Sequence, residues 1–574
     1  MKNMKKYISM IAASLLAVSC VDTVILPDDK TVDEDFWKSK SDVKLMVNGA
    51  YKSMLSSDLI ARLIVWGDLR SDELLPVSSV NDNATYEYLQ QINTGNTQYD
   101  NRYATWGSFY SVINNCNIVL SRAAEVMSED PSYTQGDYLA DCSEMTALRS
   151  LCYFYLVRNF RDVSYTEEAF TNSSQNMDIQ QSAPDSVLNC LIRDLEAVEG
   201  NAIAPNAYSD WRRVGYFNRD GIDALLADIY LWRASVKHSA ADYEKAIAYC
   251  DKVIESKKAQ HQVRVGEVDT QEYPLAEGRN MFDQLFIAQN AEESIFELQF
   301  NGTSNSNTSV CQFFNRYASN RDIPYLRAYS IFGKGQSVYK TINNTADYRG
   351  LTNTYKGTTE ELDLRKFVAI TQYSPSSIPD NSLTKETREY ANYRQNYIIY
   401  RLTDVMLMKA EALVALATAD DDIHLREAFN LVREVNTRAI EIKTDSIRWV
   451  GAQRDFAGRA GMEQLVLEER LRELAFEGKR WYDLMRYNYR NIEGVDYTTT
   501  LFDQNDRNKP FVNNYPDMVN LMVRKLGASS NAVAAKMRTE PTLYMPVSKT
   551  DMEVCPALRQ NPVYGTTGDY SKNY

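Results

Sequence analysis

Histidine is scarce in this sequence, with three copies among 574 residues, at positions 238, 261 and 424. They lie far apart, and none belongs to an H-E-x-x-H motif or another spacing typical of a metal site. The sequence also lacks a G-x-S-x-G motif, a P-loop and the glycine fingerprint of a dinucleotide-binding fold. These absences argue against the common hydrolases, metalloproteases and nucleotide-dependent enzymes.

Positive charge is in deficit as well. The chain holds 63 Lys and Arg against 77 Asp and Glu, a formal net charge of −14. Phosphate binding needs a basic face, so we do not expect a nucleic-acid partner. Beyond the N-terminus, no apolar run approaches the ~20 residues that span a bilayer.

Cysteine occurs without any C-x-x-C motif. Apart from Cys20, seven copies stand at positions 116, 142, 152, 190, 250, 311 and 555. An odd count does not fit a disulfide framework, and most of these positions lie in helical patterns. We therefore expect small apolar core residues.

The N-terminus has the pattern of an exported lipoprotein. Lys2, Lys5 and Lys6 precede the 13-residue apolar run YISMIAASLLAVS, which is too short to span a membrane. The segment LLAVSC resembles a bacterial lipobox, with Ala17 where leucine is commonest. We predict removal of residues 1–19 and lipidation of Cys20 with acyl chains such as palmitate, which would anchor the protein through lipid only. The mature chain would carry a charge of −17, from 60 basic and 77 acidic residues.

Helical periodicity dominates the rest of the chain. Residues 216–256 hold two helices that resemble a tetratricopeptide pair, although the turn between them looks several residues longer than that repeat allows. Strict 34-residue periodicity is absent, so we expect degenerate helix pairs. The predicted helices cover about 39–57, 104–127, 136–160, 184–198, 216–236, 242–256, 397–417, 424–440 and 461–487.

Two segments, 66–103 and 257–396, lose this period and are rich in Tyr, Asn and other polar residues. Within the second, ESIFELQF (293–300) alternates like a strand. Irregular loops on a helical scaffold are where binding usually resides. The sequence holds 38 tyrosines against 19 phenylalanines, and tyrosine offers a flat apolar face with a hydroxyl handle that suits polar ligands.

Sugars stack their C–H faces on aromatic rings and offer hydroxyls to Asn, Asp and Arg, a mixture found in 66–103 and 301–325. The alternative interpretation is that these rings close small local cores under the loops. We name as candidate ligand-binding residues Asn81, Asn83, Tyr86, Tyr88, Tyr99, Phe314, Arg316 and Tyr317.

The segment 461–487 could be mistaken for a catalytic site, because three glutamates follow at i, i+4 and i+8: Glu469, Glu473 and Glu477. Each has a basic residue three positions away, namely Arg472, Arg470 and Arg480 respectively. Opposite charges keep carboxylates ionised, which is unsuitable for a general acid. We therefore predict no catalytic residue here, but one continuous helix in which Gly478 admits a close neighbouring backbone.

These segments together resemble the SusD/RagB family of outer-membrane nutrient-binding lipoproteins over nearly the whole chain. The most specific match is EERLRELAFEGKRWYDLMRY (468–487), supported by GDLRSDE (67–73), ALRSLCYFYLVRNFRDV (147–163) and LDLRKF (362–367). The end, YMPVSKTDMEVCPALRQNPVYG (544–565), resembles the closing strand and tail of the family but departs from it at PVS and at VYG.

The resemblance implies a mostly α fold, in which tetratricopeptide-like helix pairs form a right-handed scaffold beside a large irregular ligand-binding region. It implies an outer-membrane position facing the extracellular side and a partner, a TonB-dependent β-barrel of the SusC type. Family members bind glycans or other nutrients without cleaving them, so we expect glycan capture, no enzyme activity and no cofactor. A structural calcium ion stays open, because DQNDRNKP (503–510) begins like a calcium loop but lacks its glycine.

We expect one structural unit behind the anchor. Its parts are a signal peptide (1–19), an acidic tether (20–36), an N-terminal helical region (37–256), an irregular ligand-binding region (257–396) and a C-terminal helical region with tail (397–574). Two alternatives remain. A secreted glycan-degrading hydrolase would need an unpaired carboxylate pair in an aromatic cleft, and a purely structural helical scaffold would not need Tyr/Asn-rich loops.

Overall fold

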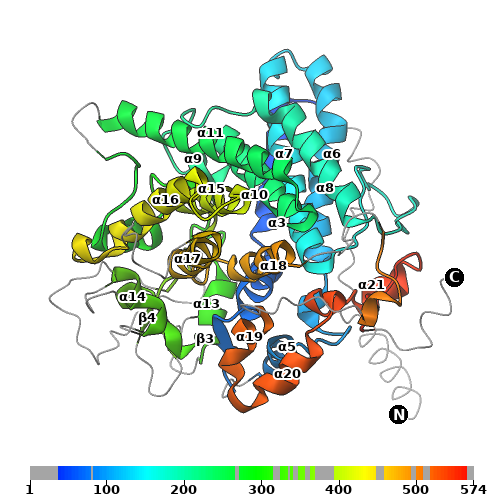
Figure 1. The fold of residues 1–574 in the computed structure, drawn as a ribbon. Coiled ribbons are helices and arrows are strands. Elements are labelled where there is room, and N and C mark those ends of the chain that lie inside the picture. Colours follow the sequence, from blue (N-terminus) through cyan, green and yellow to red (C-terminus); the bar gives the residue numbers. More distant parts are fainter. Residues whose placement is uncertain are drawn as a thin grey trace, which may run out of the picture.

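Helices build most of the protein, as the computed structural model shows (Figure 1). Cys20, Asn81, Arg316 and Tyr317 lie outside the residues that it describes. None of the described helices is both long and apolar enough to cross a membrane. The described residues are 36–78, 82–265, 271–314, 323–333, 336–340, 347–355, 362–368, 393–447, 458–492, 500–508 and 518–564.

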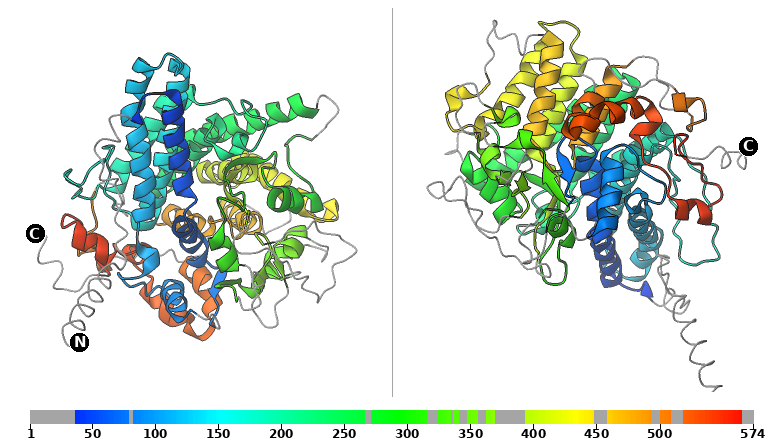
Figure 2. Two further views of the ribbon diagram at one scale, coloured as in Figure 1. Left: turned by 180° about the vertical axis from the view of Figure 1, so that it is seen from behind. Right: turned by 90° about the horizontal axis from the view of Figure 1, so that it is seen from below.

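The long helices pack as sequential pairs, which confirms the predicted helical class. The pairs are α6 (Gly107–Glu129) with α7 (Gln135–Phe160), α10 (Arg219–Lys237) with α11 (Ala240–Val265), and α15 (Leu402–Leu416) with α16 (Ile423–Ala439). Helix α8 (Pro184–Val198) also packs on α7. Helix α3 (Lys40–Met54) lies along the α6–α7 pair, as the view from behind shows (Figure 2).

The connection between α10 and α11 is shorter than the sequence indicated. Only His238 and Ser239 separate the two helices, so the prediction of an extended turn is wrong. His238 adopts a left-handed conformation (φ 53°, ψ 40°) that ends α10, and its Nε2 lies 2.9 Å from the carbonyl oxygen of Tyr489. A single left-handed residue therefore reverses the chain where the sequence gives no glycine signal.

Helix α7 occupies the centre of the N-terminal half. It begins with a capping box, in which Thr134 accepts from the N–H of Asp137 and the Asp137 carboxylate accepts from the N–H of Thr134. Residues 143–160 of this helix are buried on every side, because α6, α8 and α10 all contact it. The apolar residues among them belong to one hydrophobic core that runs from Trp37 to Leu558.

Short strands tie distant segments to this scaffold. Strand β2 (Ser294–Leu298), expected from the alternating ESIFELQF, pairs antiparallel with β6 (Tyr397–Arg401). The helix predicted from residue 397 therefore begins only at Leu402, because the first five residues are a fully buried strand. Two smaller pairs are β1 (Leu74–Pro76) with β3 (Leu326–Ala328) and β4 (Thr354–Tyr355) with β5 (Asp363–Leu364).

The predicted continuous helix 461–487 is wrong, because the chain forms α17 (Gly458–Glu473) and α18 (Arg480–Arg490) with a turn between them. Phe476 and Gly478 have positive φ angles of 66° and 72°. The close backbone approach predicted at Gly478 does occur, since a β-carbon on Gly67 would lie 2.3 Å from the Gly478 carbonyl oxygen. The turn pairs its N–H groups with carboxylates of a remote segment, which offsets the loss of helical hydrogen bonds.

Candidate functional site

The structure brings together the two Tyr/Asn-rich segments that the sequence singled out. Strand β1 pairs with β3, with Leu74 opposite Ala328, and the pairing continues as the N–H of Val77 donates to the carbonyl oxygen of Tyr325 at 2.9 Å. The Phe313 ring packs edge-on against Tyr325, at 5.6 Å between centroids. In Figure 1, α5, α13 and β3 accordingly share the lower part of the molecule.

The first segment contains a helix that the sequence did not predict, α5 (Asn83–Asn93). The carboxylate of Asp82 accepts from the N–H of Thr85 at 3.0 Å and caps this helix. Thr85, Leu89 and Ile92 fall on one buried face, so an amide-rich stretch still packs as an amphipathic helix. The exposed face of α5 is thereby fixed on the scaffold.

Four candidate residues lie on or beside α5. Asn83 is exposed in its first turn, and Tyr86 and Tyr88 are half-buried along it. Tyr88 also packs against the hydrophobic core. Tyr99, in the loop after the helix, is 39% exposed, and its carbonyl oxygen accepts from the N–H of Lys549. Three tyrosines of different exposure thus lie on α5 or in the loop that follows it.

Phe314 does not fit the predicted role. Its side chain, at the end of α13 (Thr308–Phe314), is 1% exposed. The ring stacks on Phe367 at 5.9 Å and packs against Phe313 at 6.5 Å. The prediction of Phe314 as a ligand-binding residue is therefore wrong, because its faces are occupied by other core rings.

Sequence reasoning missed polar groups that lie between the two segments. The hydroxyl of Tyr325 donates to Asp82 Oδ2 at 3.5 Å, and Asp82 also caps α5. Hydrogen bonds from Thr85 lower the pKa of the Asp82 carboxyl, so it stays ionised. The Arg102 guanidinium lies 5.4 Å from the Tyr103 ring centroid, with its side chain 54% exposed. The sequence did not indicate this arrangement, because the helix that Asp82 caps was itself not predicted.

A second exposed aromatic surface lies elsewhere, and the sequence did not select it. Trp211 is 44% exposed, and its ring contacts Tyr216 at 5.4 Å. It precedes the short helix α9 (Arg212–Gly215), which packs on β2. This surface belongs to neither predicted segment, so it supplies a comparison for the surface around α5.

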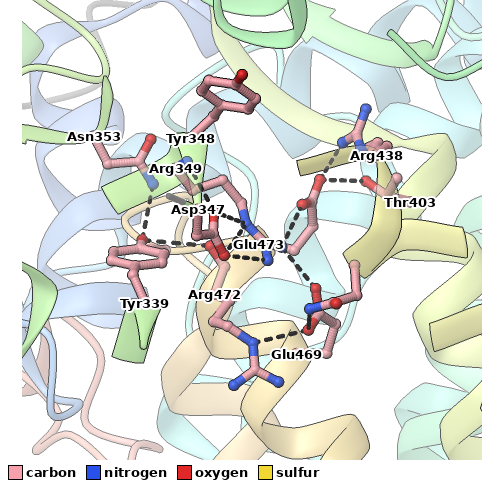
Figure 3. Close-up of polar contacts among 12 residues, drawn as sticks. Tyr339, Asp347, Tyr348, Arg349, Asn353, Thr403, Arg438, Glu469, Arg472 and Glu473 are labelled. Atoms are coloured by element: carbon pink, nitrogen blue, oxygen red, sulfur yellow. Dashed lines mark hydrogen bonds and ion pairs between the residues drawn. The ribbon is translucent and has the colours of Figure 1, made fainter. Parts of the chain in front are cut away.

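The three glutamates of 461–487 lie in a buried network of charges, and Figure 3 shows the part around Glu469 and Glu473. Glu473 accepts from Arg349 at 3.0 Å and from the guanidinium groups of Arg401 and Arg438. Burial alone would raise the pKa of Glu473, but the charges of these arginines outweigh it and hold the pKa well below its usual value. The predicted ionised state is confirmed, and this cluster offers no protonated acid.

The partners of these glutamates differ from those that sequence spacing indicated. Arg472 does contact Glu469, with its Nε 2.8 Å from Oε2. Arg470 and Arg480 instead bind other carboxylates, those of Asp404, Asp483 and Asp72. Basic groups remote in sequence bind the glutamates instead. Arg349 pairs with Glu469, and Lys366 and Arg401 both pair with Glu477. The network therefore joins α17 and the following turn to the segments around 349, 366 and 401.

Metal ligation has little support in the part of the chain that is described. There, no group of three or more His, Cys, Asp or Glu side chains is arranged to hold an ion. In the calcium-like loop, Asp503 Oδ1 accepts from the N–H of Asn505 at 2.6 Å. Asp506 Oδ2 accepts from the N–H of Asp503 at 2.9 Å, so both carboxylates serve the turn itself.

Comparison with known families divides the chain into two matching parts. Residues 299–564 match a sequence model described as the SusD family. Residues 27–231 match a model described as "Starch-binding associating with outer membrane". The surface around α5 and β1 lies within the second match, and α13, β3 and the α17–α18 turn lie within the first.

Two relatives match most of the chain in a single alignment. SusD-like protein P2 of Formosa agariphila is 25% identical over 507 residues, which are 85% of this chain and 92% of the relative. SusD-like protein P38 of the same organism is 24% identical over 516 residues, 83% of this chain and 90% of the relative.

Solved structures share the fold. A SusD homolog from Bacteroides thetaiotaomicron has a TM-score of 0.66 at 17% identity, covering 93% of this chain and 99% of that one. A SusD superfamily protein from Bacteroides vulgatus has a TM-score of 0.64 at 15% identity, covering 92% and 99%. The chain is therefore a SusD-like protein, and the two family descriptions that it matches point to glycan binding and to association with the outer membrane.

Proposed function

We propose that this protein captures an oligosaccharide on the surface formed by α5, the loop after it and the β1–β3 pair, and does not cleave it. The observation that carries the proposal is the meeting of two Tyr/Asn-rich segments, more than 200 positions apart in sequence, at one strand pair. Half-exposed tyrosines stand there beside amide, carboxylate and guanidinium groups, as sugar binding requires.

Binding of this kind depends on stacking area and neutral hydrogen bonds. Tyr86, Tyr88 and Tyr99 would supply ring faces, with Asn83 and Arg102 as hydroxyl partners. Such a site should bind with a Kd in the micromolar to millimolar range, roughly −4 to −8 kcal/mol. For a neutral glycan, affinity should change little with salt, because screening acts on charged ligands.

Binding without cleavage is supported by the burial and ion pairing of the three glutamates of 461–487, whose spacing resembles that of a catalytic site. Glu469, Glu473 and Glu477 are at most 3% exposed, and each is bound by at least two cationic groups. Neither a protonated acid nor a free base is available from them to a sugar in solvent. The proposal therefore assigns them to the scaffold.

Position and partner complete the proposal. The lipobox-like segment before Cys20 supports a lipid anchor, with the protein on the extracellular face of the outer membrane. Similarity to the SusD family supports delivery of the captured glycan to a TonB-dependent barrel of the SusC type. Such a barrel should co-purify from outer membranes solubilised in mild detergent, and recovery as a free monomer in several detergents would contradict this partnership.

The binding claim is tested with lipid-free protein, residues 21–574, titrated calorimetrically against a panel of oligosaccharides. At least one glycan should bind in the stated range, with similar affinity at low and high salt. Each binding glycan is then incubated with pure protein and assayed for new reducing ends. Release of reducing ends would overturn capture without cleavage in favour of a hydrolase, and a panel without any binder would contradict the glycan assignment.

A further inference from the structure

Arg70 differs from the other buried arginines described above. It follows the π-helix η1 (Val65–Leu69) and is 8% exposed. Its Nη1 donates to Asn159 Oδ1 at 3.2 Å and its Nη2 to the carbonyl oxygen of Leu543, both neutral acceptors. Among the residues that the structure describes, no carboxylate pairs with it. By contrast, a carboxylate binds each of Arg349, Arg401, Arg438 and Arg480.

A small cavity lies beside this guanidinium. It is lined by the end of α5, the start of α18, α19 (Met518–Val523) and the chain near Met545 and Tyr564. It has room for a single occupant of water or halide size. Apolar side chains form much of its wall: Ile92, Met522, Val523, Met537 and Met545.

Two buried polar atoms on residues of this wall lack hydrogen-bond partners. Trp481 is fully buried, and its Nε1–H has no acceptor. Asn93 Oδ1 also has no partner, and its Nδ2 reaches Gln90 Oε1 only at 3.4 Å. The amide of Asn93 could therefore turn and present its NH₂ group to the cavity. Buried polar atoms are nearly always satisfied, so two such atoms at one cavity indicate an occupant.

The electrostatics favour an anion over water as that occupant. The Arg70 guanidinium lies 3.9 Å over the Trp481 ring centroid, and both side chains line the cavity. Burial lowers the pKa of Arg70 to about 10, and the nearby titratable groups are tyrosines, which are neutral at physiological pH. An unpaired charge among methionines is costly. Water would satisfy the N–H groups but would leave this charge unbalanced.

We propose that the cavity beside Arg70 and Trp481 binds a small monovalent anion, chloride in solution, held by the free N–H groups of the guanidinium and by the indole N–H. The anion would neutralise Arg70 within the core and join the end of α5 to α18 and α19. This site is separate from the exposed face of α5, and its occupancy does not depend on any glycan.

Bromide is the probe, because it matches chloride in charge and nearly in size and scatters X-rays anomalously. Crystals of the lipid-free protein are soaked in sodium bromide, and the expected result is an anomalous peak in hydrogen-bonding contact with Arg70 and Trp481. In solution, the melting temperature should rise saturably with bromide at constant ionic strength, with sodium gluconate as the balancing salt. Gluconate is too large for the cavity.

Two tryptophan variants form a matched pair. Trp481→Phe keeps the ring under Arg70 but removes the N–H, and it should shift the bromide dependence to at least about tenfold higher concentration, since a hydrogen bond to an ion contributes about 1.5–3 kcal/mol. Trp232→Phe removes another buried indole N–H without a partner, away from this cavity, and should leave the dependence unchanged. Arg70→Met should abolish the dependence, and Trp481→Phe keeps the test valid if that variant does not fold.

Several results would overturn the proposal. One is a cavity without an anomalous peak in bromide-soaked crystals. Another is a melting temperature that rises equally in bromide and gluconate. A bromide effect of the same size in Trp481→Phe and wild type would place the anion elsewhere.

Discussion

Gly67 and Gly478 lie backbone against backbone. A β-carbon on Gly67 would stand 2.3 Å from the Gly478 carbonyl oxygen and 2.5 Å from its Cα. The N–H of Gly478 donates to Oδ1 of Asp68, the residue after Gly67, at 2.7 Å. A π-helix near the N-terminus and the turn between α17 and α18 thus hold each other in shape, and a side chain at Gly67 would separate them.

Gly67→Ala should therefore destabilise the protein by roughly 1–3 kcal/mol or more, the usual cost of overpacking where the neighbour is backbone. Urea unfolding of the lipid-free protein measures the change. Gly49→Ala is the matched control, because Gly49 lies in α3 with nothing within 4 Å of its added β-carbon. That substitution should be neutral or stabilising by up to about 1 kcal/mol. Equal effects of the two substitutions would contradict the close contact.

Glu473→Gln should reduce stability by about 3–5 kcal/mol, because it leaves Arg349, Arg401 and Arg438 around a neutral amide. Glycan affinity should not change, since the residue is buried within the scaffold. Glu468→Gln is the control: its side chain is 46% exposed and lies 3.7 Å from Arg472, so the loss should stay under about 0.5 kcal/mol. Normal unfolding together with abolished glycan binding in Glu473→Gln would show that the ligand site was misplaced.

Asp68 should make the protein less stable as the pH rises towards 8. Burial raises the pKa of Asp68 to about 7, against about 3.9 in an unfolded chain. A raised folded-state pKa contributes stability that is complete below about pH 4 and is lost as the pH rises through about 7. Asp68→Asn keeps an oxygen acceptor for Gly478 but does not titrate, so the free energy of unfolding should fall less between pH 5 and 8.

The control for this pH prediction is the neighbouring carboxylate of Asp72. Burial alone would raise the pKa of Asp72, but Arg480 outweighs burial and lowers it, so this group titrates below the window. Asp72→Asn should lower stability at every pH from 5 to 8 while keeping the wild-type slope. Parallel slopes for Asp68→Asn and wild type, measured by urea unfolding, would contradict the assignment to Asp68.

Replacement of single rings by alanine at Tyr86, Tyr88 and Tyr99 should weaken glycan binding by about 1–3 kcal/mol each, by analogy with base–aromatic stacking. Calorimetry with a glycan identified from the panel measures the effect. Trp211→Ala is the control, since Trp211 has a similar exposure, 44% against 39% for Tyr99, on the other aromatic surface. Wild-type affinity in all three tyrosine variants would exclude the α5 surface, and weakened binding in Trp211→Ala alone would place the glycan there.

Phe314→Ala and Tyr317→Ala complete this series. Because Phe314 is buried against Phe367, its loss should cost about 3–5 kcal/mol of stability and leave the affinity of the folded protein unchanged. Tyr317 stays a predicted ligand residue, and its variant should weaken binding without destabilising the fold.

Cys20→Ala should give a folded protein that no longer associates with membranes. Without the cysteine sulfur, no acyl chains are attached, and each buried methylene contributes about 0.8 kcal/mol to anchoring. Fractionation of cells that express either form measures the partitioning. If both forms sediment equally with the outer membrane, the lipoprotein assignment fails.

Where burial is one-sided, sequence periodicity predicts the fold well. Helices such as α6 and α8 appear close to their expected bounds, because a regular apolar stripe needs only one neighbour. The break between Glu473 and Arg480 was not predictable, since it depends on Asp68 and Glu73 receiving the N–H groups of the turn. Tertiary contacts there override the local sequence, whose apolar periodicity is that of a helix.

In the candidate site, too, the sequence predicted some features and tertiary contacts decided the others. Composition indicated the two segments, and the β1–β3 pairing brings them together. The exposure of each ring could not be predicted from the sequence. Phe314 is buried and Tyr99 is exposed because the fold packs different numbers of residues around them, although both stand in similar polar, aromatic-rich segments. Likewise, the ionised state of Glu473 was predictable from nearby positive charge, but its partners Arg401 and Arg438 come from other elements.

The β2–β6 pair has a consequence for how this family can diversify. It fixes Leu298 opposite Tyr397, so the chain between these residues leaves and re-enters the scaffold at one strand pair, and β3, Arg349 and Lys366 bind it to the scaffold at further points. The entropy lost in closing such an excursion grows only logarithmically with its length, at about 0.6 kcal/mol per doubling. Insertions and deletions in the loops between these fixed points are therefore thermodynamically cheap, and new ligand contacts can evolve there without a change in the helices of the scaffold.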